Sequence, residues 1–274
     1  MPELPEVETV AAALRRASLE GRKITGYTVR CEKLRRPLPG KELAKIVGLR
    51  LESIRRRAKY LLLQLDDGKT LLLHLGMTGT LRLDDRQSPP GRHDHFDLEF
   101  DDGRILRFRD PRKFGLVAVS RPDDTGRLPE LATLAPEPLG EEFTGEYLYA
   151  ISRKRQTPVK VFIMDQRRVV GVGNIYASES LFRAGIRPTL PAGKLSRKRC
   201  ERLVETIREI LREAIAAGGT TISDFQGVDG SEGAFVRTLR VYGKAGEPCP
   251  QCGNPISKTV LGGRSTFYCP KCQK

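Results

Sequence analysis

Residues 60–75, YLLLQLDDGKTLLLHL, contain two short apolar runs separated by the turn signal Asp66-Asp67-Gly68. This pattern is typical of two antiparallel strands joined by a tight turn. Three further runs follow, FDLEF, ILRFRD and LVAVS, and Asp102-Gly103 stands before the second of them. Residues 24–119 are therefore predicted to form an all-β domain, either a sandwich or a flattened barrel.

Helical patterns flank this β region on both sides. Pro5 is followed by apolar residues at helical spacing, namely Val7, Val10, Ala11 and Leu14. A longer helix is predicted to begin at Ser196 and to end at Gly218-Gly219, with one apolar face made of Leu203, Ile207, Ile210, Leu211 and Ala214. Residues 121–145, rich in Pro, Gly, Asp and Glu, predict a connection with little regular structure.

The charge of the chain is distributed unevenly. The 274 residues are enough for two domains and a small third one. Residues 1–150 hold 26 basic and 24 acidic side chains, whereas residues 151–274 hold 22 and 10, so the C-terminal part carries most of the net charge of +14. This asymmetry predicts a polyanionic partner gripped mainly by the C-terminal part. No apolar run is long enough to cross a membrane, and the acidic N-terminus is unlike a signal peptide.

Four cysteines near the C-terminus have the spacing of a metal site. Cys249 and Cys252 form one pair, and Cys269 and Cys272 form a second pair after sixteen intervening residues. The pattern predicts a closed tetrahedral Zn²⁺ site in a zinc ribbon, with two redox-active pairs as the alternative. Such a metal is structural, because four thiolates leave no open coordination position. The intervening residues predict a β-hairpin with Gly262-Gly263 at its tip, and its cations favour binding to nucleic acid.

The N-terminal sequence MPELPEVET suggests a second kind of chemistry. If Met1 is removed, Pro2 becomes a secondary α-amine, a class of group that titrates at about 7.7–8, so a substantial fraction is unprotonated at neutral pH. Such an amine can attack an aldehyde-level carbon and form a cationic iminium, while Glu3 can move protons. The alternative is that Pro2 and Glu3 only begin a helix.

Several motifs, in order along nearly the whole chain, carry a family resemblance. They are MPELPEVET, RAKYLL at 57–62, HLGMTG at 74–79, DPRKFG at 110–115, GVGNIYA at 171–177 and the four-cysteine finger. Together they resemble the bacterial formamidopyrimidine-DNA glycosylases. The related endonuclease VIII proteins usually open with MPEGPE, so Leu4 favours the purine-lesion branch.

The resemblance implies an α+β multidomain fold. It consists of an N-terminal antiparallel β-sandwich with an N-terminal helix, a helix–two-turn–helix domain and a β-hairpin zinc ribbon. The boundaries we expect are 1–125 for the catalytic sandwich, 126–148 for a linker, 149–225 for the helix–two-turn–helix domain and 226–274 for the finger, with the metal hairpin at 240–274.

The resemblance also implies a bifunctional enzyme of base excision repair. It would remove 8-oxoguanine and formamidopyrimidines from duplex DNA and then cut the strand by β,δ-elimination through a Schiff base. We expect a monomer that acts on damaged double-stranded DNA in the bacterial cytoplasm, at the nucleoid, with one structural zinc and no organic cofactor. Two alternatives are an oxidised-pyrimidine glycosylase of the endonuclease VIII type and a non-catalytic DNA-binding protein.

The resemblance assigns catalytic roles to a small set of residues. Pro2 is the expected nucleophile at C1′, and Glu3 is its acid/base partner. Lys59, which we interpret as part of an apolar strand, is expected to contact phosphate at the catalytic pocket. Glu6 is expected near the sugar, and a charge that stabilises the helix start is an equal alternative for it. Arg264 is expected to donate a proton in δ-elimination.

Other residues are implied in holding DNA. Extrusion of a nucleotide leaves a gap in the duplex, and Met77, Arg112 and Phe114 are expected to fill it, although core packing is an alternative for Met77 and Phe114. The expected phosphate contacts are His74, Asn174, Tyr242, Lys258 and Arg264. Residues 220–236 predict a long loop, whose lesion-reading part is expected to include Thr220, Thr221, Ile222, Ser223, Asp224 and Phe225.

Overall fold

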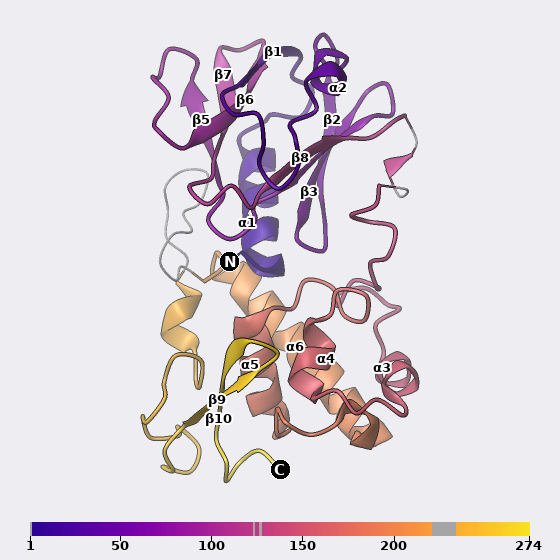
Figure 1. The fold of residues 1–274 in the computed structure, drawn as a ribbon, viewed down its shortest axis with the longest axis vertical. Helices are drawn as coiled ribbons and strands as arrows, with labels where there is room; N and C mark the ends of the chain where they lie inside the picture. Colours follow the sequence, from indigo (N-terminus) through magenta and orange to yellow (C-terminus); the bar gives the residue numbers. More distant parts are fainter. Residues whose placement is uncertain (1, 123, 126–127, 221–233) are drawn as a thin grey trace. The chain divides into compact units, whose positions relative to one another are not determined.

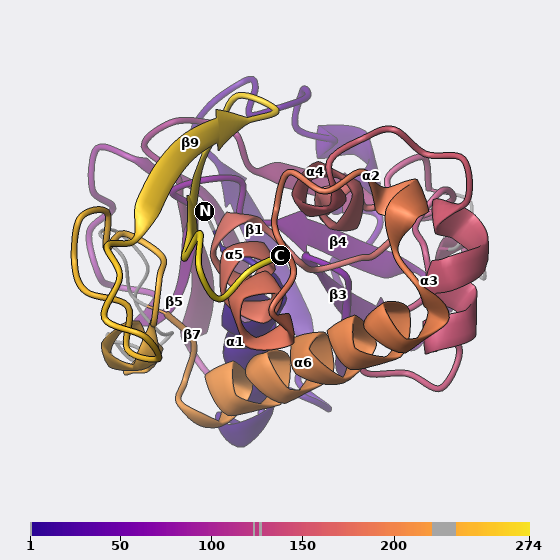
Figure 2. The same cartoon turned by 90° about the horizontal axis from the view of Figure 1, so that it is seen from below.

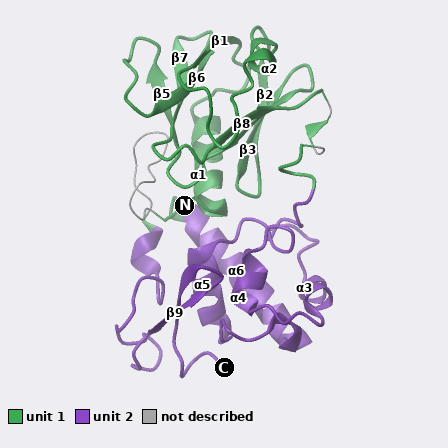
Figure 3. Ribbon diagram, viewed as in Figure 1, with its two compact units in different colours: residues 1–132, 217–234 green, residues 133–216, 235–274 purple. Residues whose placement is uncertain are grey.

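The computed structural model describes residues 2–122, 124–125, 128–220 and 234–274 (Figure 1). The chain divides into two compact units (Figure 3). The first unit comprises residues 1–132 and 217–234, and the second comprises residues 133–216 and 235–274. The first unit is therefore built from two separate segments of the chain.

The first unit is a β-sandwich of two four-stranded antiparallel sheets, with strand orders β1-β6-β7-β5 and β2-β3-β4-β8. The strands are β1 (Ile24–Val29), β2 (Leu51–Arg57), β3 (Tyr60–Leu65), β4 (Thr70–His74), β5 (Thr80–Asp85), β6 (Asp94–Phe100), β7 (Arg104–Arg109) and β8 (Leu116–Val119). Both predicted hairpins are confirmed, because β3 pairs with β4 and β6 pairs with β7. Their turn glycines, Gly68 and Gly103, have φ of 83° and 85°, which only glycine adopts readily.

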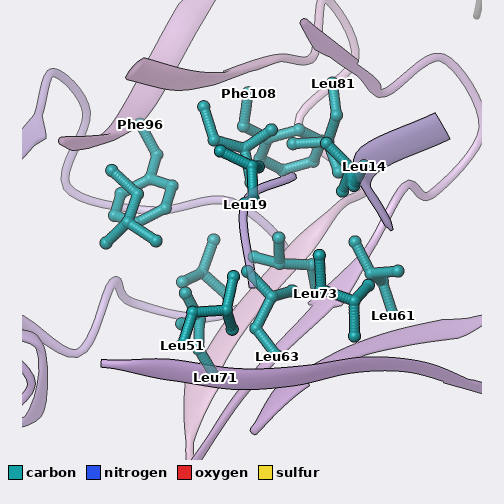
Figure 4. Packing of buried hydrophobic residues seen from close by; sticks show 14 of the residues in the cluster. Leu14, Leu19, Leu51, Leu61, Leu63, Leu71, Leu73, Leu81, Phe96 and Phe108 are labelled. Atoms are coloured by element: carbon teal, nitrogen blue, oxygen red, sulfur yellow. The ribbon is translucent and has the colours of Figure 1, made fainter. Parts of the chain in front are cut away.

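The hydrophobic core of this unit is made mainly of leucines from the two sheets and the first helix (Figure 4). Along β3 every second residue is buried, whereas all five residues of β4 are buried. Helix α1 (Leu4–Arg16) packs against β2 and β3, and its predicted apolar face is buried. Burying each leucine contributes about 1.5–3 kcal/mol. The core thereby fixes the start of α1. A short helix, α2 (Gly40–Ala44), was not predicted.

The second unit is mainly helical and ends in a hairpin. Its elements are α3 (Gly145–Ser152), α4 (Val159–Met164), α5 (Asn174–Ala184), η2 (Ala192–Lys194), α6 (Arg197–Ala216), η3 (Phe235–Thr238), β9 (Ser257–Leu261) and β10 (Arg264–Tyr268). The predicted long helix is confirmed as α6, where the Ser196 hydroxyl accepts the Arg199 N–H at 3.3 Å and the predicted apolar face is buried. Helix α6 packs against α5 (Figure 2). Between Val119 and Gly145, the described residues form no α-helix or β-strand, as predicted.

The C-terminal hairpin is joined to the helices by a shared core. Strands β9 and β10 pair with Gly262 and Gly263 at the turn, as predicted. Phe267 of β10 and Phe182 of α5 belong to one buried cluster with two of the cysteines. The buried Gln273 side chain donates to the Ile186 carbonyl at 2.8 Å. The finger is thus part of the second unit.

No helix among the described residues is long and apolar enough to cross a membrane.

Candidate functional site

The N-terminal residues are buried at the start of α1. Pro2 is buried, and Glu3 and Glu6 are each 2% exposed. The two carboxylates form a capping box, in which Glu3 accepts the Glu6 N–H and Glu6 Oε2 accepts the Glu3 N–H at 2.8 Å. The positive end of the helix dipole also stabilises these charges. Pro2 therefore directly precedes a helix start that two buried carboxylates cap.

Glu6 also binds the segment that follows α6. Its Oε1 accepts the Thr220 N–H at 2.8 Å. Gly219 has φ of 83°, and a Cβ there would lie 3.1 Å from Glu6 Oε1, so a side chain would crowd this contact. Thr220, the first residue of the expected lesion-reading loop, is therefore hydrogen-bonded to α1. Five of the expected lesion-reading residues lie outside the described part of the chain, namely Thr221, Ile222, Ser223, Asp224 and Phe225. The predicted long loop ends earlier than expected, because Phe235 belongs to η3.

Lys59 lies in the turn between β2 and β3, so our placement of it in a strand is wrong. The apolar run that follows conceals the turn, which is made by Ala58 at φ of 53° without a glycine. Lys59 is 7% exposed. Arg56 donates to the Ala58 carbonyl at 3.1 Å and to Glu8 of α1 at 2.8 Å, which ties this turn to the N-terminal helix. Burial would raise the pKa of Glu8, but hydrogen bonds from Arg15 and Arg56 outweigh it and hold that pKa below its usual value.

His74, at the end of β4, has a fixed protonation state. Its Nδ1 lies 2.9 Å from the Gly76 nitrogen and 3.1 Å from Arg35 Nη2. Both neighbours can only donate, so Nδ1 accepts and the ring proton sits on Nε2. Burial, followed by the positive charges of Arg35 and Lys59, lowers the pKa of His74 to about 3. His74 is therefore a neutral N–H donor at physiological pH.

The three expected gap-filling residues lie on two loops of the first unit. Met77 follows β4, and Arg112 and Phe114 follow β7. Met77 is 37% exposed and Phe114 is 44% exposed, so neither belongs to the core. The Arg112 guanidinium lies 4.8 Å from the centre of the Phe114 ring. Exposed apolar side chains beside a cation suit contact with bases.

Asn174 is the first residue of α5 and connects that helix to the finger. Its Nδ2 donates to the Ser265 carbonyl at 3.0 Å and to Tyr242 Oη at 3.4 Å. Its Oδ1 accepts from Lys160 Nζ at 2.5 Å. Two of the expected phosphate contacts, Asn174 and Tyr242, are thus brought together.

Two buried charged residues that bond to Asn174 and Tyr242 were not predicted from the sequence. Lys160 is fully buried, and its Nζ also donates to the Ser265 carbonyl and the Thr266 hydroxyl. Glu179 of α5 is 2% exposed, and its carboxylate accepts three consecutive backbone N–H groups, those of residues 240, 241 and 242, at 2.8–3.0 Å. A lysine inside the apolar run VKVFIM and a glutamate inside ASESLF were the available signals.

Lys258 and Arg264 are exposed on the hairpin of the second unit. Lys258 pairs with Phe267, and Arg264 opens β10 opposite Leu261. The expected residues therefore divide between the units. The first unit holds Pro2, Glu3, Glu6, Lys59, His74, Met77, Arg112, Phe114 and Thr220, and the second holds Asn174, Tyr242, Lys258 and Arg264.

The four C-terminal cysteines form a metal-binding cluster. Their Sγ atoms all lie within 4.8 Å of one another, and none of the four is in a disulfide. Cys249 and Cys272 have sulfurs 3.9 Å apart, and Cys252 and Cys269 have sulfurs 3.5 Å apart. Tetrahedral coordination with Zn–S bonds of about 2.3 Å requires sulfur separations of about 3.8 Å, so the donor set fits one zinc ion. The alternative of two redox pairs is not supported.

Comparisons with known proteins cover the whole chain. Residues 1–117 match the formamidopyrimidine-DNA glycosylase N-terminal domain, residues 134–226 match the H2TH domain of the same proteins, and residues 246–274 match a zinc finger found in FPG and IleRS. The formamidopyrimidine-DNA glycosylase of Thioalkalivibrio sulfidiphilus is 52% identical over 275 residues, which is 100% of both chains.

Solved structures of FPG proteins have the same fold as this chain. The MutM (FPG) protein of Thermus thermophilus has a TM-score of 0.89 at 39% identity, covering 99% of this chain and 98% of that one. A Lactococcus lactis FPG mutant, solved with DNA containing Fapy-dG, has a TM-score of 0.92 at 34% identity over 100% of both chains.

Proposed function

The chain belongs to the formamidopyrimidine-DNA glycosylase family, and from this premise we propose that Pro2 is the nucleophile with which it removes oxidised purines from duplex DNA. The protein is a DNA glycosylase of base excision repair, and cleavage at the resulting abasic site accords with the family. The observation that carries the assignment is the buried Pro2 directly before a helix whose first turn is capped by Glu3 and Glu6.

The chemistry follows from a secondary amine at this position. After removal of Met1, the nitrogen lone pair of Pro2 forms a bond to C1′, the glycosidic bond breaks, and the base leaves with a proton. Opening of the sugar ring, with Glu3 supplying the proton to O4′, gives an iminium. The iminium acidifies the C2′ proton, so β-elimination breaks the C3′–O bond, and δ-elimination then breaks the C5′–O bond with Arg264 as proton donor. Glu6 holds the Glu3 backbone near the sugar.

The remaining residues bind and deform the DNA. Met77, Arg112 and Phe114 occupy the space that the extruded nucleotide leaves. Lys59, His74, Asn174, Tyr242, Lys258 and Arg264 contact phosphates around the lesion, with His74 contributing a neutral N–H. Residues 220–225 contact the damaged base. Cys249, Cys252, Cys269 and Cys272 hold one zinc ion, which supplies stability to the finger and leaves no position open for substrate.

The domain limits and the location belong to the same proposal. The catalytic sandwich spans 1–125, the linker 126–148, the helix–two-turn–helix domain 149–225 and the finger 226–274. A monomer acting on chromosomal DNA works in the bacterial cytoplasm, at the nucleoid.

Borohydride trapping tests the nucleophile. With duplex DNA that contains 8-oxoguanine opposite cytosine, borohydride reduces the iminium and leaves a stable protein–DNA adduct. Peptide mass spectrometry is expected to place the adduct on Pro2, and a protein with a chemically blocked N-terminus is expected to give none. A Lys59→Ala variant is a second check, because it lacks the primary amine that we place at the catalytic pocket and keeps Pro2 as the expected position of the adduct.

Two results would overturn the proposal. Undiminished trapping with the N-terminus blocked removes Pro2 from the reaction, and an adduct that mass spectrometry places on Lys59 transfers the role to Lys59. The same assay with thymine glycol separates the endonuclease VIII type of activity, which requires faster release of that base than of 8-oxoguanine. Binding without any trapping or cutting corresponds to a non-catalytic DNA-binding protein.

A further inference from the structure

The two loops that carry Met77, Arg112 and Phe114 both cross between the sheets of the sandwich. The first, residues 75–79, connects β4 of one sheet to β5 of the other, and the second, residues 110–115, connects β7 back to β8. We call them the insertion loops. Neither sheet alone fixes the position of one loop relative to the other, because each loop leaves one hydrogen-bonded ladder and enters the other.

Asp110 connects the two insertion loops through its carboxylate. This residue is fully buried. Its Oδ1 accepts the Thr78 hydroxyl at 2.9 Å, and its Oδ2 accepts the Gly115 N–H at 2.7 Å. The Thr78 oxygen in turn accepts the Arg112 N–H at 3.3 Å. A single carboxylate and a single hydroxyl therefore bind both loops next to all three gap-filling residues.

The backbones of the insertion loops are also in close contact. A Cβ on Gly76 would lie 2.5 Å from the Phe114 carbonyl carbon, so only glycine permits this approach. A Cβ on Gly115 would lie 2.5 Å from the Phe108 ring and 3.0 Å from Asp110 Oδ2. From a third segment, Arg35 Nε donates to the Phe114 carbonyl at 3.0 Å. The two loops are thus held as one body, with Asp110 inside it and the three side chains on its outer surface.

We propose that Asp110 and Thr78 are a positioning pair, which holds Met77, Arg112 and Phe114 in the relative arrangement needed to enter the duplex. This inference rests on the proposed function, since it concerns how the lesion is extruded. Extrusion breaks stacking and pairing, and side chains already held in place fill the gap without a further loss of loop entropy. Neither Asp110 nor Thr78 touches the reacting atoms, so both act through the loops.

The decisive variant is Thr78→Val, which keeps the shape of the side chain and removes the hydroxyl. Asp110 Oδ1 and the Arg112 N–H then both lose their partner. Thr78→Ser restores the hydroxyl and is expected to restore function. Thr70→Val is the matched control, because Thr70 is a buried threonine at the opposite end of β4 whose hydroxyl bonds to Thr125 at 2.8 Å. This substitution removes one hydroxyl hydrogen bond that lies outside the insertion loops.

Two measurements separate positioning from general stability. Single-turnover release of 8-oxoguanine from duplex DNA requires extrusion, whereas cutting of a single-stranded oligonucleotide with a preformed abasic site does not. Thr78→Val is expected to slow the first by about tenfold and leave the second within about twofold, because a lost buried hydrogen bond has that order of effect. Hydrogen exchange in the free protein is expected to be about tenfold faster in peptides covering residues 110–115.

Several outcomes contradict the proposal. A Thr78→Val protein whose exchange over residues 110–115 is unchanged has no such connection between the loops. An equal fall in both activities, or a slowing in Thr70→Val as large as that in Thr78→Val, assigns the effect to stability. A wild-type protein that performs neither reaction instead disproves the proposed function, and the exchange measurement then still decides whether Asp110 and Thr78 join the loops.

Discussion

At the scale of single residues, the protonation state of His74 is set by its neighbours. Two donors converge on Nδ1, and both burial and nearby cations oppose a charge on the ring. In the proposed function its contact with DNA is therefore a hydrogen bond from a neutral group, which releases no counterion of its own. The salt dependence of binding is expected to come instead from the lysines and arginines.

The low pKa of His74 predicts a pH dependence of stability. The folded pKa of about 3 lies below the ordinary value of 6.5, so between these values the unfolded chain binds more protons than the folded one. The contribution of His74 to the free energy of unfolding is fully present above pH 6.5 and is lost as the pH is lowered toward 3. Between pH 7 and pH 5 the free energy of unfolding is expected to drop by about 1–2 kcal/mol because of this residue.

Urea unfolding of the wild type and of His74→Asn at both pH values measures that drop. Asparagine places its amide oxygen where Nδ1 accepts from Gly76 and Arg35 and does not titrate, so the variant is expected to lose less stability between pH 7 and pH 5. The same drop in both proteins contradicts the assignment.

At the scale of elements, residues 240–242 of the finger are held by one carboxylate of α5. Glu179 accepts the N–H groups of residues 240–242, and this holds the Tyr242 backbone while its ring packs 5.2 Å from that of Phe267. The Glu179 carboxylate thus accepts the backbone N–H groups that the carbonyls of a neighbouring strand would accept in a sheet.

Glu179→Gln is expected to displace Tyr242. An amide offers one acceptor oxygen and presents an NH₂ group to at least one backbone N–H, which costs about 1–3 kcal/mol. The Kd for abasic-site DNA is expected to rise, while the zinc content stays at one per chain. The control is Glu205→Gln, which changes an exposed glutamate of α6 in the same way. Equal Kd values for the two variants mean that Glu179 does not position the segment.

Local patterns predicted the hairpins and the helices α1 and α6, and contacts between distant residues could not be predicted. The hairpin turns at Asp66-Asp67-Gly68 and Gly262-Gly263 and the start of α6 at Ser196 depend on residues within a few positions of one another. Lys160 binds Thr266, which is 106 positions away, and Glu179 binds residues about 60 positions away. A single sequence contains no local pattern that identifies such distant residues as partners. The turn at Ala58 and Lys59 was missed for a local reason, because neither residue is a typical turn former.

At the scale of the whole molecule, the two units differ in how they are stabilised. The first unit has the large leucine core of a sandwich, whereas the end of the second unit relies on a small cluster and four cysteines. The expected DNA contacts Tyr242, Lys258 and Arg264 all belong to the part that depends on the metal. Most of the net charge therefore lies in the unit whose C-terminal end zinc stabilises.

Removal of zinc is expected to abolish DNA cutting and to leave the sandwich folded. Hydrogen exchange after treatment with a chelator is expected to become fast over residues 249–272 and to stay slow over residues 60–75, because only the first segment depends on the metal. Cys272→Ser is expected to reproduce the loss, and Cys31→Ser, which changes a cysteine outside the cluster, is expected to keep zinc and activity. Full activity in the chelated protein contradicts a structural role for the metal.

The hydrogen bond between Glu6 and Thr220 joins residues 214 positions apart. Protein synthesis adds about 5–20 residues per second, so roughly 10–40 s separate the appearance of the two partners at the ribosome. For most of that interval the N-terminal amine is outside the ribosome, while the segment that we propose to contact the damaged base has not been made. The end that carries the proposed nucleophile is thus the first part to be synthesised, and its hydrogen bond to Thr220 is among the last contacts to form.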